Sequence, residues 1–299
     1  EQLERLLSLW TKPDSGQTED TLYRQKSSFQ AVRFKLYRMG EPEFPTLDEF
    51  LEEELPVDGC LGFDGRVVNS ELGYGLQNLL QEKNVTINCS KDLVGEIWTS
   101  RPAMSCEPIW SLDVKYAGET VASKLARIRE EMKEAGTNVH VVSTLDDICW
   151  TLNIRGNDID FFPLVLSYGI ITMDSFELYI DERKLDDKLK AKLAKDGVNL
   201  HPYNDIYEDV KKFGSDVVAM IDPGKLNYAL FNNIPENVKT IEKRNPAILM
   251  KAIKNPVEIE NIRKAQIKDS VAHVRFMKWL KENVGKMKIT EMSASDKLD

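Results

Sequence analysis

The sequence predicts an α/β protein in which helices are layered around a mostly central sheet. Short apolar runs alternate with amphipathic segments through most of the chain, and this alternation is typical of α/β layer structures. At 299 residues the chain is longer than one average domain, so we expect at least two domains. Hydrophobic residues make up 42% of the chain and charged residues 30%, a composition that excludes intrinsic disorder.

The first part of the chain contains two expected helices. One covers residues 46–55, because Thr46 can cap its first turn and Glu49 follows at the spacing of a capping box. The other covers residues 71–84, although its two glycines weaken the prediction. Strands are expected over residues 34–39, 60–63 and 85–89, and a polar loop over residues 11–21.

The second part opens with the most regular helix of the chain, over residues 120–136. Its apolar side chains fall on one helical face, and Gly136 provides a left-handed end. The residues of that face are Val121, Leu125, Ile128 and Met132. Further helices are expected over residues 143–153, 184–197, 204–214 and 225–234.

Strands alternate with these helices. The apolar run 164–172 predicts a long strand buried on both faces, and the following residues, MDSFELYID, predict a hairpin with a two-residue polar turn. The other strands are expected over residues 139–143, 198–203 and 216–222.

A long helix of about seven turns follows Asn255. Asn255 is its expected cap, Pro256 occupies its first position and Glu258 completes a capping box. A further helix begins after Thr290. The sequence starts without Met in an apolar segment and stops inside this last helix, so we expect a truncated part of a longer protein.

Charge and hydropathy exclude two classes of partner. The formal net charge is -9, whereas a nonspecific grip on nucleic acid needs clustered Lys and Arg. No apolar run approaches the roughly 20 residues that span a bilayer, and the first residues do not form a signal peptide. We therefore expect a cytoplasmic protein without nucleic acid or membrane partners.

Common catalytic motifs are missing from the sequence. It contains neither of the glycine-rich phosphate loops, GxGxxG and GxxxxGK[ST], and neither GxSxG nor HExxH. The cysteines show no CxxC pair, and buried free thiols are expected for Cys60, Cys89, Cys106 and Cys149. No histidine has a second ligand at metal spacing, which holds for His140, His201 and His273.

The stretch DICWTLNIRGNDIDFFP, residues 147–163, combines features that a simple connector does not need. Trp150 and Asn153 precede Arg155 at helical spacing, and the Gly-Asn pair after it favours a turn. Arg155 can offer a fork of donors to a peptide carboxylate or carbonyl. The alternative is that it pairs with Asp158 or Asp160 to hold the turn, and spacing alone leaves both open.

The chain resembles a known family along three runs. They are YAGETVASKLARIREEM, LDDICWTLNIRGNDIDFFPLVLSYGIIT and AILMKAIKNPVEIENIRKAQIKDSVAHVRFMKWL. They are similar to the middle domain and the beginning of the catalytic domain of three-domain Xaa-Pro aminopeptidases, of the creatinase and aminopeptidase P family. The resemblance extends from Tyr116 to the end and, more weakly, over residues 34–110. The chain departs from the family pattern after LWT and at Phe162, a position that is often polar in relatives.

The resemblance implies two creatinase N-terminal-like domains with mixed sheets flanked by helices, then the first helices of a pita-bread domain. The expected boundaries are residues 1–115, 116–247 and 248–299. It also implies that the complete enzyme is a metalloaminopeptidase, expected to be a homo-oligomer, that releases the N-terminal residue before proline from short peptides. Its two metal ions, typically manganese, would be held by ligands beyond Asp299.

This chain is therefore expected to hold no catalytic residue and no metal, and to shape substrate access. The expected wall of the access path is formed by Trp150, Asn153, Arg155 and Asp158. One rival interpretation is a noncatalytic interaction module that binds basic peptides such as histone tails. Another is a creatinase-type amidinohydrolase, which shares the pita-bread fold without the two metals. The run KAIKNPVEIENIRKAQ favours the aminopeptidase lineage.

Overall fold

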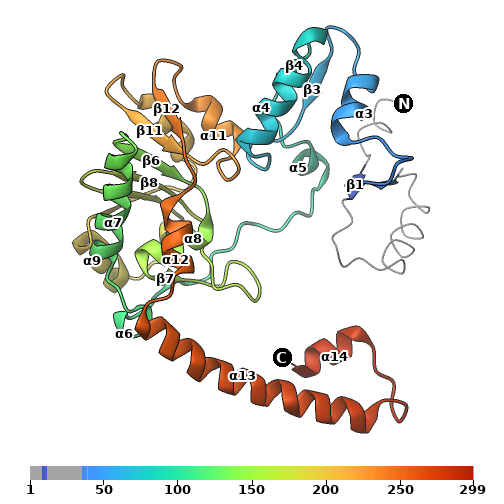
Figure 1. Cartoon of the computed structure of the whole chain (residues 1–299), viewed down its shortest axis with the longest axis vertical. Coiled ribbons are helices and arrows are strands. Elements are labelled where there is room, and N and C mark those ends of the chain that lie inside the picture. Colours follow the sequence, from blue (N-terminus) through green and yellow to red (C-terminus); the bar gives the residue numbers. More distant parts are fainter. Residues whose placement is uncertain (1–8, 12–35, 39, 299) are drawn as a thin grey trace. The chain divides into compact units, whose positions relative to one another are not determined.

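The computed structural model describes residues 9–11, 36–38 and 40–298, which divide into two compact units (Figure 1). Unit 1 contains the described residues of Glu1–Arg101 together with Asn227–Ala229, and unit 2 contains those of Pro102–Leu226 and Leu230–Asp299. Apart from Thr11, the loop predicted over residues 11–21 lies outside the described residues.

Unit 1 consists of short strands and helices around a small apolar core. Its strands form two parallel pairs, β1 (Leu9–Thr11) with β2 (Leu36–Arg38) and β3 (Cys60–Gly62) with β4 (Thr86–Asn88). Its helices are α3 (Leu47–Glu54), α4 (Ser70–Leu79), a 3-10 turn (Gln81–Lys83) and α5 (Leu93–Ile97). The core is formed by Leu51, Leu76 and Leu80.

The predicted capping box of α3 is confirmed. Glu49 N donates to Thr46 Oγ1 at 3.2 Å, and Thr46 N donates to Glu49 Oε2 at 2.7 Å. These bonds satisfy backbone donors that have no partner inside the helix.

Unit 2 is built on one six-stranded mixed sheet, which confirms the predicted α/β class. The strand order is β10 (Val198–His201), β9 (Phe176–Tyr179), β8 (Tyr168–Thr172), β6 (Val139–Val142), β11 (Val218–Ile221), β12 (Lys239–Glu242). β8 is antiparallel to both of its neighbours, whereas the outer pairs are parallel. A separate two-stranded ribbon joins β5 (Trp110–Ser111) to β7 (Ile154–Arg155).

Nine α-helices follow Arg101 in the described chain, and Figure 1 shows α7, α8 and α9 beside this sheet. Their bounds are α6 (Val114–Ala117), α7 (Val121–Glu134), α8 (Leu145–Leu152), α9 (Asp187–Lys195), α10 (Ile206–Asp209), α11 (Tyr228–Asn233), α12 (Pro246–Ala252), α13 (Pro256–Asn283) and α14 (Glu291–Leu298). Two 3-10 turns cover Glu182–Lys184 and Val210–Lys212.

Alternation along β9 shows that both faces of the sheet are covered. Phe176 and Leu178 belong to the main core cluster, which also contains the apolar stripes of α7, α8 and α9. The next residue, Tyr179, points to the opposite face and donates to Asp209 of α10 at 3.0 Å. The helices are therefore distributed on two sides, as the alternating sequence pattern predicts.

Two expectations for strands need correction. The strand predicted over residues 164–172 begins only at Tyr168, because the backbone of Leu166 donates to the Asp158 carboxylate at 2.7 Å rather than to a neighbouring strand. The hairpin between β8 and β9 exists, but its connection is three residues long, residues 173–175. The elements β12 and α12 were not predicted, because residues 235–252 have a weak alternation and an early proline.

The long helix α13 starts as predicted. Glu258 N donates to Asn255 Oδ1 at 3.0 Å, and Asn255 N donates to Glu258 Oε2 at 2.9 Å. Asn255 Nδ2 also donates to Ala117 O at 2.8 Å, which ties the start of α13 to α6. A side chain at Gly118, whose φ is +71°, would collide with Asn255, so this close approach requires glycine.

Candidate functional site

The candidate site begins at the turn that joins α8 to β7. Asn153 ends α8 in the left-handed conformation, with φ 50° and ψ 43°, and its backbone N–H donates to the carbonyls of Cys149 and Trp150. Asparagine tolerates this conformation better than most residues. The chain therefore reverses sharply after the helix, and Arg155 follows in β7.

A buried lysine holds this turn through hydrogen bonds. Lys124 of α7 is 1% exposed, and its Nζ donates to Trp150 O and to Asn153 Oδ1, both at 2.7 Å. The same ammonium lies 4.3 Å from the centre of the Trp150 ring, which adds a cation–π contact. Burial lowers the pKa of Lys124 to about 8, and the carboxylates of Glu119 and Glu258 oppose that shift.

Asn153 links this cluster to the start of α7. Its Nδ2 donates to Glu119 O at 2.9 Å while its Oδ1 accepts from Lys124. Trp150 and Asn153 are 6% and 1% exposed, so a substrate cannot reach most of either side chain in this conformation. Both residues are in position to hold the turn rather than to contact a ligand.

Arg155 does not pair with an aspartate. Its guanidinium donates to the carbonyl of Cys149 in the last turn of α8 at 2.8 Å and to that of Ile154 in β7 at 2.7 Å. The interpretation in which Asp158 or Asp160 neutralises it is therefore wrong. Burial lowers the pKa of Arg155, and the side chain is partly exposed.

Asp158 belongs to a second, separate polar contact. Its Oδ2 accepts from Lys184 Nζ and from Leu166 N, both at 2.7 Å, and the two charged side chains are 0% exposed. Within the described residues its Oδ1 is buried without a hydrogen-bond partner. Breaking such a pair leaves an uncompensated charge, so this contact fixes the loop after β7 firmly.

The structure thus joins Trp150 and Asn153 through Lys124. It gives Arg155 backbone carbonyl groups as partners, and it pairs Asp158 with Lys184. Sequence reasoning missed Lys124 and Lys184. Lys124 had a readable signal, because it follows Val121 by three residues and so lies on the apolar face of its helix. Nothing local in the sequence marks Lys184 as the partner of a residue 26 positions away.

Histidines and cysteines take structural positions. His140 is 1% exposed, and since a carbonyl can only accept, its Nδ1 donates to Met220 O at 3.0 Å. His201 contacts Glu177 at 2.6 Å, and His273 lies on an exposed part of α13. None of the four cysteines, all of which are described, forms a disulfide, and only Cys149 is buried, which corrects the expectation of burial for the other three.

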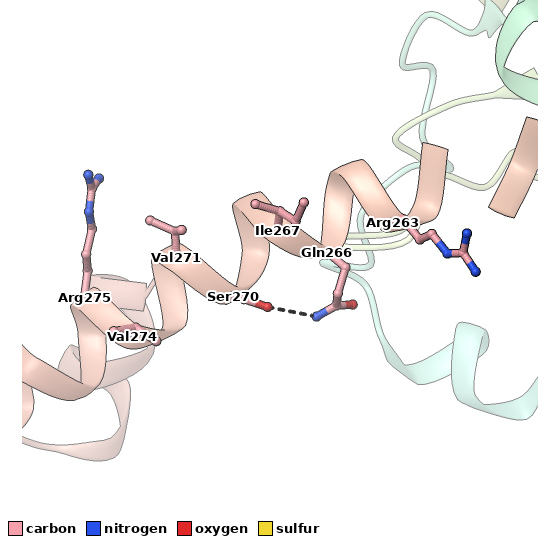
Figure 2. Close-up of a pocket in the computed structure, with 7 residues that line it drawn as sticks. All are labelled: Arg263, Gln266, Ile267, Ser270, Val271, Val274 and Arg275. Carbon is pink, nitrogen blue, oxygen red and sulfur yellow. Dashed lines mark hydrogen bonds between the residues drawn. The ribbon is translucent and has the colours of Figure 1, made fainter. Parts of the chain in front are cut away.

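A shallow groove with a volume of about 630 Å³ runs along α13 (Figure 2). All of its lining side chains come from this one helix, so the groove is a helix face rather than an enclosed pocket. They are Arg263, Gln266, Ile267, Ser270, Val271, Val274 and Arg275.

The described part of the chain lacks a metal-binding cluster and a membrane-spanning helix. No three His, Cys, Asp or Glu side chains gather there in a way that could hold a metal ion. No helix there has the length and apolar character needed to cross a membrane.

Comparison with known proteins identifies the class first. The family model described as "Creatinase/Prolidase N-terminal domain" matches residues 100–258, which contain the sheet of unit 2 and the turn described above. "Probable Xaa-Pro aminopeptidase P" of Sordaria macrospora is 32% identical over 300 residues, covering 94% of this chain and 48% of the relative. "Xaa-Pro aminopeptidase 1" of Dictyostelium discoideum is 34% identical over 271 residues, covering 85% and 42%. The chain belongs to the aminopeptidase P family.

A solved structure agrees with this assignment. The X-prolyl aminopeptidase of Caenorhabditis elegans superposes with a TM-score of 0.88 at 29% identity, covering 98% of this chain and 48% of that protein. It is described as a cytosolic enzyme with a di-nuclear active site. The chain spans about half the length of these relatives. The described residues offer no donor set for such a dinuclear centre.

Proposed function

We propose that this chain is the noncatalytic, access-shaping part of a Xaa-Pro aminopeptidase, an enzyme that releases the N-terminal residue preceding proline. The observation that carries the proposal is similarity across 94% of the chain to a relative named for that activity. Residues 1–115 and 116–247 would form the two N-terminal domains, and residues 248–299 would begin the catalytic domain. The substrates would be short peptides with proline in second place.

The metal requirement of the whole protein is part of the same proposal. We expect two divalent ions, with manganese as the first candidate, because the worm relative is described as di-nuclear. When bound, such a pair supplies activated water and polarises the scissile carbonyl. What this chain contributes is a fixed protein frame. A cytoplasmic location and a homo-oligomeric state complete the proposal.

The contribution of the α8–β7 turn follows from its hydrogen bonds. Lys124, Asn153 and Arg155 together bind the carbonyl groups at the end of α8, so the turn has little freedom to adapt. A rigid wall excludes folded or bulky N-termini more effectively than a mobile one, because a peptide can displace a mobile wall at little cost in free energy. Trp150, Asn153, Arg155 and Asp158 would thus limit access by positioning the wall rather than by gripping the peptide.

Hydrolysis by the whole protein tests the proposed activity. We expect release of the first residue from Xaa-Pro peptides, loss of this release with a chelator, and recovery with manganese. Peptides with alanine in second place are the matched control and should be poor substrates. Absence of any proline-dependent release would contradict the proposal.

Replacing Arg155 tests the role of the wall. In the whole protein, Arg155→Ala should lower kcat/KM for Xaa-Pro peptides by about tenfold, because misplacement of a positioning element by a fraction of an ångström is costly. Arg155→Lys is the control, since it keeps the charge but not the fork of donors. Unchanged kinetics on both short and long peptides would remove this role.

The acidic net charge supports the alternative function, a noncatalytic interaction module. A net charge of -9 suits a module that binds basic peptides. A pull-down with basic and with charge-neutral peptides, performed beside the hydrolysis assay, separates the two. Selective capture of basic peptides without hydrolysis would favour the interaction module.

A further inference from the structure

A small cavity lies in unit 2 at the carboxyl ends of strands β6 and β11. The two strands are parallel neighbours in the sheet, so their carboxyl ends meet at the same edge. The cavity has a volume of about 10 Å³. The polar residues of its wall come from β6 and the residues after it, the turn after β11 and the residue before α12. They are His140, Ser143, Thr144, Asp222, Lys225 and Asn245.

His140 presents a hydrogen-bond acceptor to this cavity. The residue is 1% exposed, and its Nδ1 donates to Met220 O at 3.0 Å. Burial lowers the pKa of His140, although the hydrogen bond with Met220 and the nearby carboxylates oppose that shift. The ring is therefore neutral at neutral pH and carries its proton on Nδ1. Its Nε2 can then only accept a hydrogen bond.

The wall of the cavity does not supply a donor for that acceptor. Within the described residues, His140 Nε2 is buried and has no hydrogen-bond partner. The neighbouring Asn245 amide is engaged elsewhere. Its Nδ2 donates to Asp147 Oδ2 at 2.9 Å, and its Oδ1 accepts from Ala247 N at 3.0 Å.

Both hydroxyl groups of the wall also donate to other acceptors. Ser143 Oγ donates to Lys225 O at 2.8 Å, and Thr144 Oγ1 donates to Asp147 Oδ2 at 2.6 Å. A buried acceptor without a donor is costly, because it has given up its hydrogen bonds with solvent. A donor from outside the chain would therefore be stabilised beside Nε2.

We infer that this cavity binds one water molecule, which donates a hydrogen bond to His140 Nε2. Its size selects this occupant, because about 10 Å³ is close to the smallest volume that holds a single water and is too small for an organic ligand. The Asp222 carboxylate in the same wall is the acceptor for the second hydrogen of the water. Asp222 Oδ2 also accepts from Asn245 N at 3.1 Å. The water thus connects β6 to the residue that caps α12.

This connection completes a polar network that holds α12 against the sheet. Asn245 caps α12 through Ala247 N and donates to Asp147 of α8. Asp147 Oδ1 in turn accepts from Lys251 of α12 at 2.8 Å. A bridging water is nearly as favourable as a direct hydrogen bond, so it adds β6 to the elements that fix the first turn of α12.

A crystal structure of the whole protein tests the occupancy. We expect electron density for one water at about 2.7–3.2 Å from His140 Nε2, within hydrogen-bond distance of Asp222 as well. Density that shows a direct bond from the Asn245 amide to Nε2 overturns the inference. A larger molecule beside Nε2, or no density there, overturns it too.

Two variants of His140 test what the water does for α12. His140→Gln keeps an acceptor near the position of Nε2, whereas His140→Asn keeps a donor near Nδ1 for Met220 O and loses the acceptor. In the whole protein, amide hydrogen exchange in the first turn of α12 should become about tenfold faster in His140→Asn and stay near the wild-type rate in His140→Gln. The reason is that only His140→Asn loses the acceptor that binds the water. Equal exchange rates in the two variants overturn the link to α12. If neither variant folds, the occupancy in the wild-type crystal still decides the inference.

Discussion

Helices α7 and α13 carry similar sequence patterns and have opposite surroundings. Both begin with a capped first turn and both place branched or long apolar side chains at helical spacing. In α7 the apolar stripe is buried, and Leu125 and Ile128 are 1% and 0% exposed. In α13, all of whose residues are described, none is buried, and Val271 and Val274 are 47% and 67% exposed.

Apolar periodicity therefore predicts a helix and its preferred face but not the element that covers that face. The stripe of α7 meets the sheet and α8, so its side chains join one core cluster. In the described part of unit 2 the face of α13 around Val271 and Val274 has no comparable neighbour. The helix contacts α6 at its N-terminal end, through Asn255 and Asn261, and α14 near its C-terminal end, where Lys297 lies over the Trp279 ring. Burial, and not the pattern alone, decides how much each helix contributes to stability.

The strongest test compares equivalent truncations in the two helices. Ile128→Ala in α7 should lower the free energy of unfolding by about 2–5 kcal/mol, because it leaves a cavity in a closed core. Val271→Ala in α13 should change it by less than about 0.5 kcal/mol, as exposed substitutions usually do. Urea unfolding of the 299-residue chain measures both. Comparable losses would show that the face of α13 is covered in solution.

Lys124 is a charged residue on the buried face of α7, so it should make the stability of the chain depend on pH. Its folded pKa of about 8 lies below the roughly 10.4 of an unfolded lysine. Between these values the unfolded chain binds more protons, so the free energy of unfolding should rise with pH, by at most about 1.4 kcal/mol per pH unit. Relative to Lys124→Met, the wild type should therefore gain stability from pH 8 to pH 10. A flat or falling difference would contradict the buried position.

Asn255 tests how firmly the start of α13 is anchored to α6. Asn255→Ala removes both the helix cap and the bond to Ala117, and should cost about 1 kcal/mol. Asn255→Asp is the matched variant, because it keeps an acceptor for Glu258 N and loses only the donor to Ala117. Hydrogen exchange in the first turn of α13 measures the effect, and equal protection in all three proteins would count against the anchor.

The smallest effect is expected on the exposed surface of α13. Lys264 pairs with Glu260 at 2.6 Å one turn away, and both side chains are about two-thirds exposed, at 67% and 68%. Because solvent and salt screen such pairs, Lys264→Ala should be indistinguishable from the wild type in urea unfolding at physiological salt. A clear loss of stability would show that this part of the helix packs against something.

Much of the candidate site could not be read from its own residues. Trp150, Asn153 and Arg155 lie within two turns of one helix end, so their nearness follows from the sequence alone. The spacing did not determine the hydrogen-bond partner of the Arg155 guanidinium, because carbonyl groups and aspartates are equally available at that spacing. The structure assigns the carbonyl groups, and gives Asp158 to Lys184 instead.

Local spacing in the chain was enough to predict four features: the capping boxes at Thr46 and Asn255, the left-handed end at Gly136, and the apolar stripe of α7. These depend on groups within about one helical turn of each other, so they form wherever the residues stand. Three features became visible only in the folded protein: the order of the six strands, the burial of Lys124 and the ion pair between Asp158 and Lys184. They depend on residues far apart in the chain, and the free energy of such contacts exists only once the sheet and its helices have enclosed them.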